Sequence, residues 1–248
     1  MRHSHKFVDS HYVFMISIII PVYNQAEKLK RCLESILAQI YRDFEIIIVN
    51  DGSSDASGEI AQKFQSEFKA INADCRIIAQ QNKGAPSARN RGWREAKGEY
   101  VLFCDADAIL DKNFLQEMLN ALKNNPLTSF AYSSFYWGNK LFRLWPFNVE
   151  KLRRLPCVHA VSLIRAKDFP ATGWDENLKR LQDWDLWLTF AEEGKSGIWI
   201  DRPLFKISPG GTMSGWLPSF AYKLFPFLPA VKKYNQAVKI IKEKHHLK

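Results

Sequence analysis

Two carboxylates separated by a single residue follow an apolar run in the segment GEYVLFCDADAIL, residues 98–110. The run from Tyr100 to Cys104 is typical of a buried strand, and Asp105 and Asp107 come directly after it. An unpaired buried carboxylate is costly, so these two side chains need compensation. Carboxylate oxygens suit Mg²⁺ and Mn²⁺, which bind through one or two carboxylates together with substrate phosphates. The pair therefore indicates a divalent cation site, and an aspartate that caps the following helix is the alternative.

The elements that would position this pair alternate along the chain between Met15 and Asp107. Strands are predicted at ISIIIPVYN, FEIIIVNDGSSD, CRIIAQ and residues 100–104, and helices in AEKLKRCLESILAQ, after Asp55, and in NKGAPSARNRGWREAKG. Strands buried on both faces and separated by helices form a parallel sheet, in which ligands bind beyond the carboxyl ends of the strands. We therefore expect the polar segments PVYNQAE, NDGSSD and DAD, which end three of the strands, to meet at one rim.

The second half of the chain has a less regular pattern. CVHAVSLIR predicts a strand, RLQDWDLWLTFAEEG predicts an amphipathic helix, and IWIDRPLFKIS predicts a strand that Pro203 breaks. The C-terminal segment LPAVKKYNQAVKIIKEKHHLK places an apolar stripe opposite many lysines. The stripe consists of Val231, Tyr234, Val238 and Ile241.

Composition favours one folded domain with anionic partners. The chain has 248 residues, of which 46% are hydrophobic, and 35 Lys and Arg against 26 Asp and Glu give a net charge of +9. Four scattered cysteines without a CxxC pair suggest reduced core residues of a cytosolic protein. The N-terminal segment lacks the apolar region of a signal peptide, and the run from Val13 to Ile20 is too short to span a membrane. We therefore predict a cytoplasmic protein.

Three segments of the chain together resemble family 2 glycosyltransferases, and they occur in the family's order, from about Met15 to Gly215. The segments are ISIIIPVYNQAEKLKRCLESILAQIYRDFEIIIVNDGSSD, NKGAPSARNRGWREAKGEYVLFCDADAIL and QDWDLWLTFAEEG. The resemblance implies the GT-A fold of nucleotide-diphospho-sugar transferases. That fold is α/β, with a Rossmann-like, mostly parallel central sheet flanked by helices and a smaller acceptor-side lobe. The expected organisation is an extension (1–14), a GT-A domain (15–217) with a nucleotide-binding half (15–108) and an acceptor half (109–217), and a basic amphipathic helical tail (218–248).

The resemblance also implies an activity, that of a metal-dependent, inverting glycosyltransferase of the hexosyltransferase type. The expected donor is a nucleotide-diphospho-sugar, with UDP as the first choice of nucleotide. The expected acceptor is a hydroxyl of a glycan or of a lipid-linked sugar in cell-envelope polysaccharide or lipopolysaccharide biosynthesis.

Several residues match the family's nucleotide-binding positions. Pro21, Val22 and Tyr23 would line the base pocket, Glu27 would approach the nucleoside, and Asp51 would accept a hydrogen bond from the base. Arg89 would face the base edge or diphosphate, Ala106 would contact the nucleotide, Asp105 would support the ribose or the metal, and Asp107 would ligate Mn²⁺ or Mg²⁺ directly. A first-turn helix acid is the alternative for Glu27, and a turn-shaping role is the alternative for Asp51.

For catalysis, the resemblance implies that Asp183 is the base that takes the proton of the acceptor hydroxyl. Gln182 stands where the family usually has Glu. Asp185 is the rival carboxylate, and an ordinary acid at the N-terminus of the helix is the alternative for Asp183. Acceptor contacts are expected from Trp184, Asp185, Trp187 and His159, although both tryptophans and the histidine suit a core equally well.

Three further segments carry expectations. In KISPGGTMSG, Ser208 replaces a His that related enzymes often carry, which puts a third protein ligand of the metal in doubt, and Gly210, Gly211 and Gly215 would be hinges of a lid. The aromatic and basic segment FYWGNKLFRLWPFNVEKLRRLP would face the acceptor. The lysine-rich tail would lie on an anionic membrane at the inner face of the cell membrane, or pack on the domain as an ordinary helix.

Two other functions compete with the enzyme. One is a sensor or scaffold that binds nucleotide-sugars without turnover, which the combination of Asp183 with Asp105 and Asp107 disfavours. The other is a nucleic-acid-binding protein that uses the basic aromatic segment, and we expect no nucleic acid partner.

Overall fold

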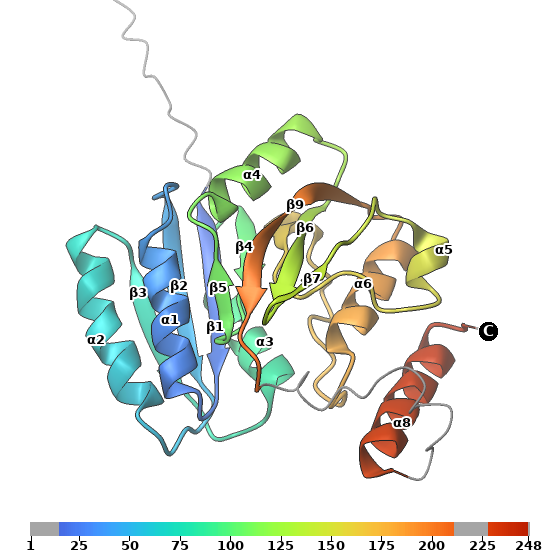
Figure 1. The fold of residues 1–248 in the computed structure, drawn as a ribbon, viewed down its shortest axis with the longest axis horizontal. Helices are drawn as coiled ribbons and strands as arrows, with labels where there is room; N and C mark the ends of the chain where they lie inside the picture. Colours follow the sequence, from blue (N-terminus) through green and yellow to red (C-terminus); the bar gives the residue numbers. More distant parts are fainter. Residues whose placement is uncertain (1–14, 211–227, 248) are drawn as a thin grey trace, which may run out of the picture.

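A computed structural model describes residues 15–210 and 228–247, and its helices pack around one mixed sheet (Figure 1). The N-terminal half contributes four mutually parallel strands in the order β3-β2-β1-β4. These strands are β1 (Ile16–Val22), β2 (Phe44–Asn50), β3 (Cys75–Ala79) and β4 (Tyr100–Phe103). The parallel α/β half expected from the sequence is therefore confirmed.

The C-terminal half extends the same sheet with mixed directions. Next to β4 the order continues β8-β6-β9-β5, and β7 pairs with β6. Only β6 and β9 are parallel to each other in this half, because β8 runs antiparallel to both β4 and β6, and β5 runs antiparallel to β9. The strands are β5 (Ala108–Leu110), β6 (Phe130–Trp137), β7 (Lys140–Phe142), β8 (Leu163–Arg165) and β9 (Gly197–Ile207).

Two strand predictions in this half are wrong in detail. Pro203 does not break β9, which continues for 11 residues. The register shifts where Ser134 pairs with Pro203, so a bulge accommodates a residue that lacks a backbone N–H. Of the segment CVHAVSLIR, only the last three residues form a strand. The residues before them form a loop that reaches the site described below.

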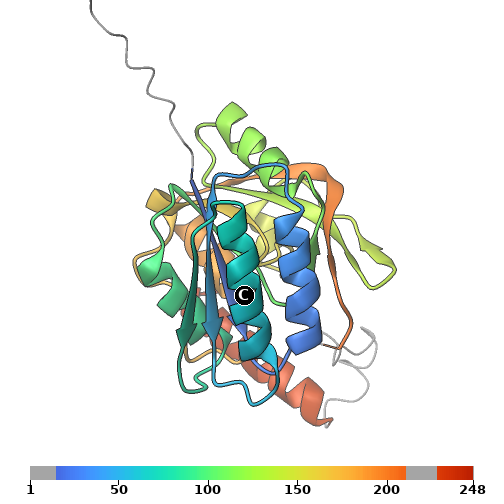
Figure 2. The ribbon, with the colours of Figure 1, turned by 90° about the vertical axis from the view of Figure 1, so that its left-hand side faces the viewer.

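Helices cover both faces of the strands. Figure 2 shows α1 (Ala26–Leu37) and α2 (Ser57–Ala70) on one side of the parallel strands and α3 (Ala85–Glu95) on the other. The alternation along β1 explains this arrangement, since Ile18 and Ile20 belong to the core under α1 and α2, whereas Ile19 belongs to the core under α3. The α4 helix (Phe114–Asn124) extends the first core, and α6 (Gln182–Glu192) extends the second.

Close contact between α3 and the sheet depends on Gly92. A Cβ atom at this position would collide with the side chain of Ile19 on β1 and press on Val49 of β2. The absence of a side chain therefore lets the α3 backbone approach the strands at the turn that follows Arg89.

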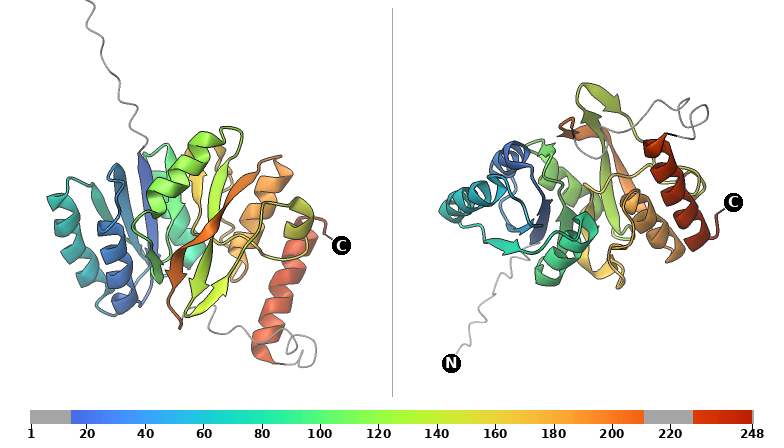
Figure 3. Two further views of the ribbon diagram at one scale, coloured as in Figure 1. Left: turned by 45° about the horizontal axis from the view of Figure 1, so that its top comes forward. Right: turned by 90° about the horizontal axis from the view of Figure 1, so that it is seen from below.

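The C-terminal segment forms α8 (Pro229–Lys244), which lies beside α6 (Figure 3). The predicted apolar stripe is confirmed, because Val231 and Ile241 are fully buried and Val238 packs against the second core. A short helix, α5 (Val149–Leu152), also contacts α6. Within residues 15–210 and 228–247, no helix is long and apolar enough to cross a membrane.

Candidate active site

A cavity of about 740 Å³ opens where the parallel strands end. The three polar strand ends predicted to meet at one rim do so. Pro21, Val22, Tyr23 and Gln25 line the cavity after β1, Asp51 lines it after β2, and Asp105, Ala106 and Asp107 line it after β4. The sequence therefore predicted correctly which side of the sheet carries the site.

Asp105 is compensated by Arg89. The Nη2 atom of Arg89 lies 2.6 Å from the Oδ1 atom of Asp105, and the guanidinium also packs over the ring of Trp174 at 4.5 Å. Burial alone would raise the pKa of Asp105, but the Arg89 charge and hydrogen bond hold that pKa below its usual value. Arg89 is itself buried, and it reaches the site because α3 lies flat on the sheet.

Asp107 has no such partner among residues 15–210 and 228–247. Burial, followed by the nearby charge of Asp105, raises the pKa of Asp107 to about 6, and the charges of Lys28 and Arg89 oppose this shift only in part. The main chain is held in place, since the Ser208 N–H donates to the Asp107 carbonyl at 2.9 Å. The negative charge on this side chain is therefore the least compensated of the pair.

The two carboxylates suit a divalent cation that completes its coordination shell with water and substrate. In the part of the chain that the structure describes, no three His, Cys, Asp or Glu side chains gather closely enough to enclose a metal ion. Ser208, at the position where a third protein ligand was in question, is buried and contributes its backbone N–H to Asp107. Mg²⁺ and Mn²⁺ commonly take phosphate oxygens and water at the remaining positions, so this donor set fits them.

Asp51 organises the loop between β3 and α3. Its Oδ1 atom accepts hydrogen bonds from the Gln80 side chain at 2.8 Å and the Lys83 N–H at 2.9 Å, and its Oδ2 atom accepts one from the Gly84 N–H at 2.8 Å. The turn-shaping role that we considered as the alternative is therefore present. The same carboxylate lines the cavity, and its Oδ2 atom has a second lone pair for a ligand.

Asp183 lies in the first turn of α6 and lines the same cavity as the Asp-x-Asp pair. Burial raises the pKa of its carboxyl group, and the nearby His159 ring, the Trp184 N–H and the Arg89 guanidinium oppose the shift. Its Oδ1 atom accepts from the N–H of Trp184 at 2.9 Å. The helix begins after Leu181, which adopts a left-handed conformation with φ of 58°.

His159 also lines the cavity, in the loop before β8. Its ring contacts both Phe135 and Phe205, with centroids 5.2 and 5.3 Å away, and these two phenylalanine rings stack on each other at 5.1 Å. Burial lowers the pKa of His159. The Nδ1 atom accepts a hydrogen bond from the Val161 N–H at 3.0 Å, so the neutral ring carries its proton on Nε2. This tautomer can donate a hydrogen bond into the cavity but offers no lone pair there.

Gln182 connects the two sides of the cavity. Its Oε1 atom accepts from Arg89 at 3.2 Å, and its Nε2 atom donates to the Leu178 carbonyl at 3.0 Å. Glutamine at position 182, where the family usually has glutamate, therefore accepts a hydrogen bond from Arg89 but carries no negative charge.

Four expected ligand contacts are not found at the cavity. Trp184 and Trp187 are buried in the second core, where the Trp184 Nε1–H donates to the Leu152 carbonyl at 2.6 Å and the Trp187 ring lies 4.3 Å from Phe130. Asp185 is buried against α8. Glu27 is an exposed acid in the first turn of α1, outside the cavity.

The aromatic and basic segment contributes several residues to the cavity wall, and its role towards an acceptor stays a prediction. Among the residues that line the cavity are Trp137, Phe142, Arg143 and Trp145. Sequence reasoning missed Tyr234, which enters the lining from α8. The stripe pattern contained this tyrosine but gave no sign of where the helix would dock. Gly210 ends the described part of the predicted lid, and Gly211 and Gly215 lie outside the described residues.

The fold is that of a GT-A glycosyltransferase. The family model Glycosyl transferase family 2 matches residues 17–169, so the chain belongs to this family. It is 34% identical over 134 residues to glycosyltransferase GlyA of Streptococcus pneumoniae, a match that covers 54% of this chain and 18% of GlyA. The chain therefore spans less than a fifth of that relative's length.

Solved structures agree on the fold. S. aureus TarS 1-349 in complex with UDP-GlcNAc matches with a TM-score of 0.70 at 17% identity, covering 94% of this chain and 72% of that one. The mannosyltransferase PcManGT from Pyrobaculum calidifontis, in complex with GDP-Man and Mn²⁺, matches with a TM-score of 0.67 at 17% identity, covering 90% and 64%.

Proposed function

We propose that this chain transfers a sugar, with inversion at the anomeric carbon, from a UDP-sugar to a hydroxyl of a glycan or lipid-linked acceptor. The observation that carries the proposal is that Arg89, Asp105, Asp107 and Asp183 surround one cavity at the strand ends. The UDP-GlcNAc complex of TarS supports UDP as the nucleotide, although the GDP-Man complex of PcManGT keeps guanine as a second possibility.

In this proposal the nucleotide occupies the side of the cavity formed by the ends of β1 and β2. Tyr23 and Val22 contact the base, and Asp51 accepts a base N–H through its remaining lone pair. Asp105 and Asp107 would hold Mn²⁺ or Mg²⁺, which would neutralise charge that develops on the departing diphosphate. The high pKa of Asp107 supports this role, since a bound cation would supply the compensation that the protein lacks.

Asp183 is the proposed base. Its raised pKa means a stronger proton acceptor than an ordinary aspartate, which helps it to take the proton of the acceptor hydroxyl as that oxygen attacks the anomeric carbon. Attack comes from the face opposite the diphosphate, and the configuration therefore inverts. His159 does not compete for this role, because its Nδ1 lone pair is already used by the Val161 N–H.

The wider setting follows from family resemblance and charge. The proposed acceptor belongs to cell-envelope polysaccharide or lipopolysaccharide biosynthesis, and the proposed location is the cytoplasm, with peripheral contact at the inner face of the membrane. Exposed lysines on α8, among them Lys232, Lys233 and Lys239, would provide that contact with anionic lipid.

The test compares wild-type protein with Asp183→Asn and with a control, Glu193→Gln, at the far end of the same helix. UDP with Mn²⁺ should raise the melting temperature of all three. Release of UDP from UDP-GlcNAc should fall by about 10²–10⁴-fold in Asp183→Asn alone. If UDP stabilises all three proteins while all three remain equally inert towards a panel of UDP-sugars and GDP-mannose, the nucleotide-sugar sensor replaces the enzyme.

A further inference from the structure

The α8 helix is attached to two residues that flank a stretch of the cavity wall. The Nζ atom of Lys244 lies 2.8 Å from the Oδ2 atom of Asp175 and 2.8 Å from the Oδ1 atom of Asp185. Asp175 lies within the loop that leads into α6, and Asp185 is in the first turn of α6. One lysine therefore joins both ends of the segment 175–185, which contains Asp183.

A histidine next to this lysine adds a second attachment. The Nε2 atom of His245 lies 2.9 Å from the Asp185 Oδ1 atom, and its Nδ1 atom lies 2.9 Å from the Glu192 Oε1 atom. The side chains of His245 and Asp185 are only 1% and 5% exposed, so the contact between these two is sheltered from water, whereas Glu192 is 49% exposed. Charged hydrogen bonds in such surroundings are stronger than ion pairs on an open surface.

The segment held in this way forms a large part of the acceptor half of the cavity. Leu178, Lys179, Arg180, Leu181 and Gln182 all line it, and Leu181 has an unfavourable left-handed backbone. A non-glycine residue in that conformation costs about 1–3 kcal/mol and persists only where neighbouring contacts hold it. The described contacts of this segment with α8 provide part of that restraint.

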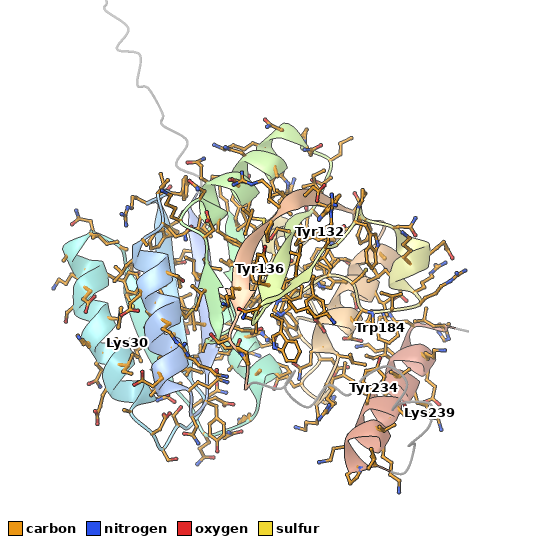
Figure 4. All side chains as sticks on the ribbon, viewed as in Figure 1. Lys30, Tyr132, Tyr136, Trp184, Tyr234 and Lys239 are labelled. Atoms are coloured by element: carbon orange, nitrogen blue, oxygen red, sulfur yellow. The ribbon has the colours of Figure 1, made fainter. Side chains whose placement is uncertain are left out.

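The helix also enters the cavity itself. Tyr234 lines the wall, and Figure 4 shows Tyr234 and Lys239 on different sides of α8. Five residues separate the two positions, so they point about 140° apart on a helix. The face of α8 that carries Tyr234 is therefore directed to the site, while Lys239, whose side chain is 77% exposed, faces water.

We propose that α8 is a positioning element of the active site, in which Lys244 and His245 hold the segment 175–185 so that Asp183 and the acceptor-side loop keep their places. This inference rests on the proposed function for the meaning of Asp183. The proposal differs from a role of the basic tail as a membrane contact alone, because Lys244 and His245 contact the domain and not its surroundings.

The experiment measures hydrogen exchange of the full chain in four forms: wild type, Lys244→Met, Lys244→Arg and the control Lys239→Met. In Lys244→Met, amides of residues 175–186 should exchange about tenfold faster, while amides of β1 and β2 remain unchanged. Lys244→Arg should restore slow exchange because it keeps the charge and the donors. Unchanged exchange at 175–186, or an equal increase throughout the chain, would overturn the proposal.

A kinetic measurement separates this inference from the proposed function. With UDP-GlcNAc and Mn²⁺, Lys244→Met should release UDP about tenfold more slowly at saturating donor, and its donor KM should stay within about twofold of wild type. A tenfold loss in kcat/KM that comes from a higher KM, with kcat unchanged, would contradict a positioning role. If wild type neither binds UDP nor releases it, the proposed function fails, and the exchange result still decides whether α8 orders the segment.

Discussion

The buried Arg89 forms an ion pair with Asp105, whose side chain is 24% exposed, and the same guanidinium donates from its other terminal nitrogen to Gln182. One side chain from α3 thus touches both the turn after β4 and the first residue of α6. The proposed donor and acceptor halves of the cavity are therefore joined through a single arginine, and a change at this position should affect both.

Replacing Arg89 by Met should destabilise the protein by about 3–5 kcal/mol, because Asp105 would be left buried without its counter-charge. The measurement is urea unfolding, with Arg91→Met as the control, since Arg91 is half exposed and pairs only with Glu95 one turn away. Adding Asp105→Asn to Arg89→Met should recover part of the loss. If Arg89→Met lowers the free energy of unfolding no more than Arg91→Met does, water already reaches Asp105.

Asp107→Asn should have opposite effects on the free protein and on the nucleotide complex. A carboxyl pKa raised to about 6 means that the native state holds a proton which the unfolded state has lost, so stability falls as the pH rises from about 4 to about 6. Removing the charge should therefore raise the stability of the metal-free protein at neutral pH by roughly 1–3 kcal/mol. The same change should abolish the additional stabilisation that Mn²⁺ gives in the presence of UDP. Chemical unfolding at a pH of about 7.5 measures the stability of the metal-free protein. Thermal shift measures the additional stabilisation by Mn²⁺ in the presence of UDP.

His245 should make the attachment of α8 depend on pH. Burial alone would lower the pKa of His245, but its hydrogen bonds and charge interactions with Asp185 and Glu192 raise it above its usual value. The neighbouring Lys244 faces the same Asp185. A raised histidine pKa stabilises the folded state fully below the unfolded pKa of about 6.5, and this stabilisation is lost as the pH rises through the folded value.

Backbone amides exchange faster as the pH rises, even in an unstructured chain. After correction for this intrinsic dependence, the amides of α8 should be better protected from exchange at a pH of about 6 than at about 9. His245→Asn should remove this difference, while His246→Asn, at an exposed neighbouring residue, should keep it. A pH dependence that is identical in wild type and His245→Asn would assign the effect to another group.

Glu27→Gln should leave UDP binding within about twofold of wild type, because this exposed side chain lies outside the cavity. Asp51→Asn provides the contrast. Its amide nitrogen would meet either the Lys83 or the Gly84 N–H, so the loop should shift and UDP binding should weaken by tenfold or more, about 1.4 kcal/mol. Titration with UDP followed by calorimetry measures both variants.

The sequence predicted the parallel half of the sheet and its polar rim well because the signals are local. The predicted polar segments directly follow β1, β2 and β4, and two of them contain Asp51 and Asp105. The partner of Asp105 could not be read from spacing, since Arg89 reaches it across the sheet from α3. Family resemblance placed both residues near the nucleotide without joining them.

The acceptor half was harder to predict for two physical reasons. Trp184 and Trp187 lie three residues apart on α6, and the same spacing suits a ligand-facing surface and a core-facing one, so burial decided between them. The position of α8 depends on contacts across about 60 residues of sequence, such as His245 with Asp185, which no periodic pattern reveals. Only the tertiary structure brings Tyr234 into the cavity wall.

Gly92 sets the height of α3 above the strands, and Arg89 lies on that helix less than one turn before it. A single methyl group at this glycine would lift the helix from the sheet and carry the guanidinium away from its carboxylate. Charge balance in the cavity thus depends on a hydrogen atom of Gly92 that faces the strands, about one helical turn from the arginine.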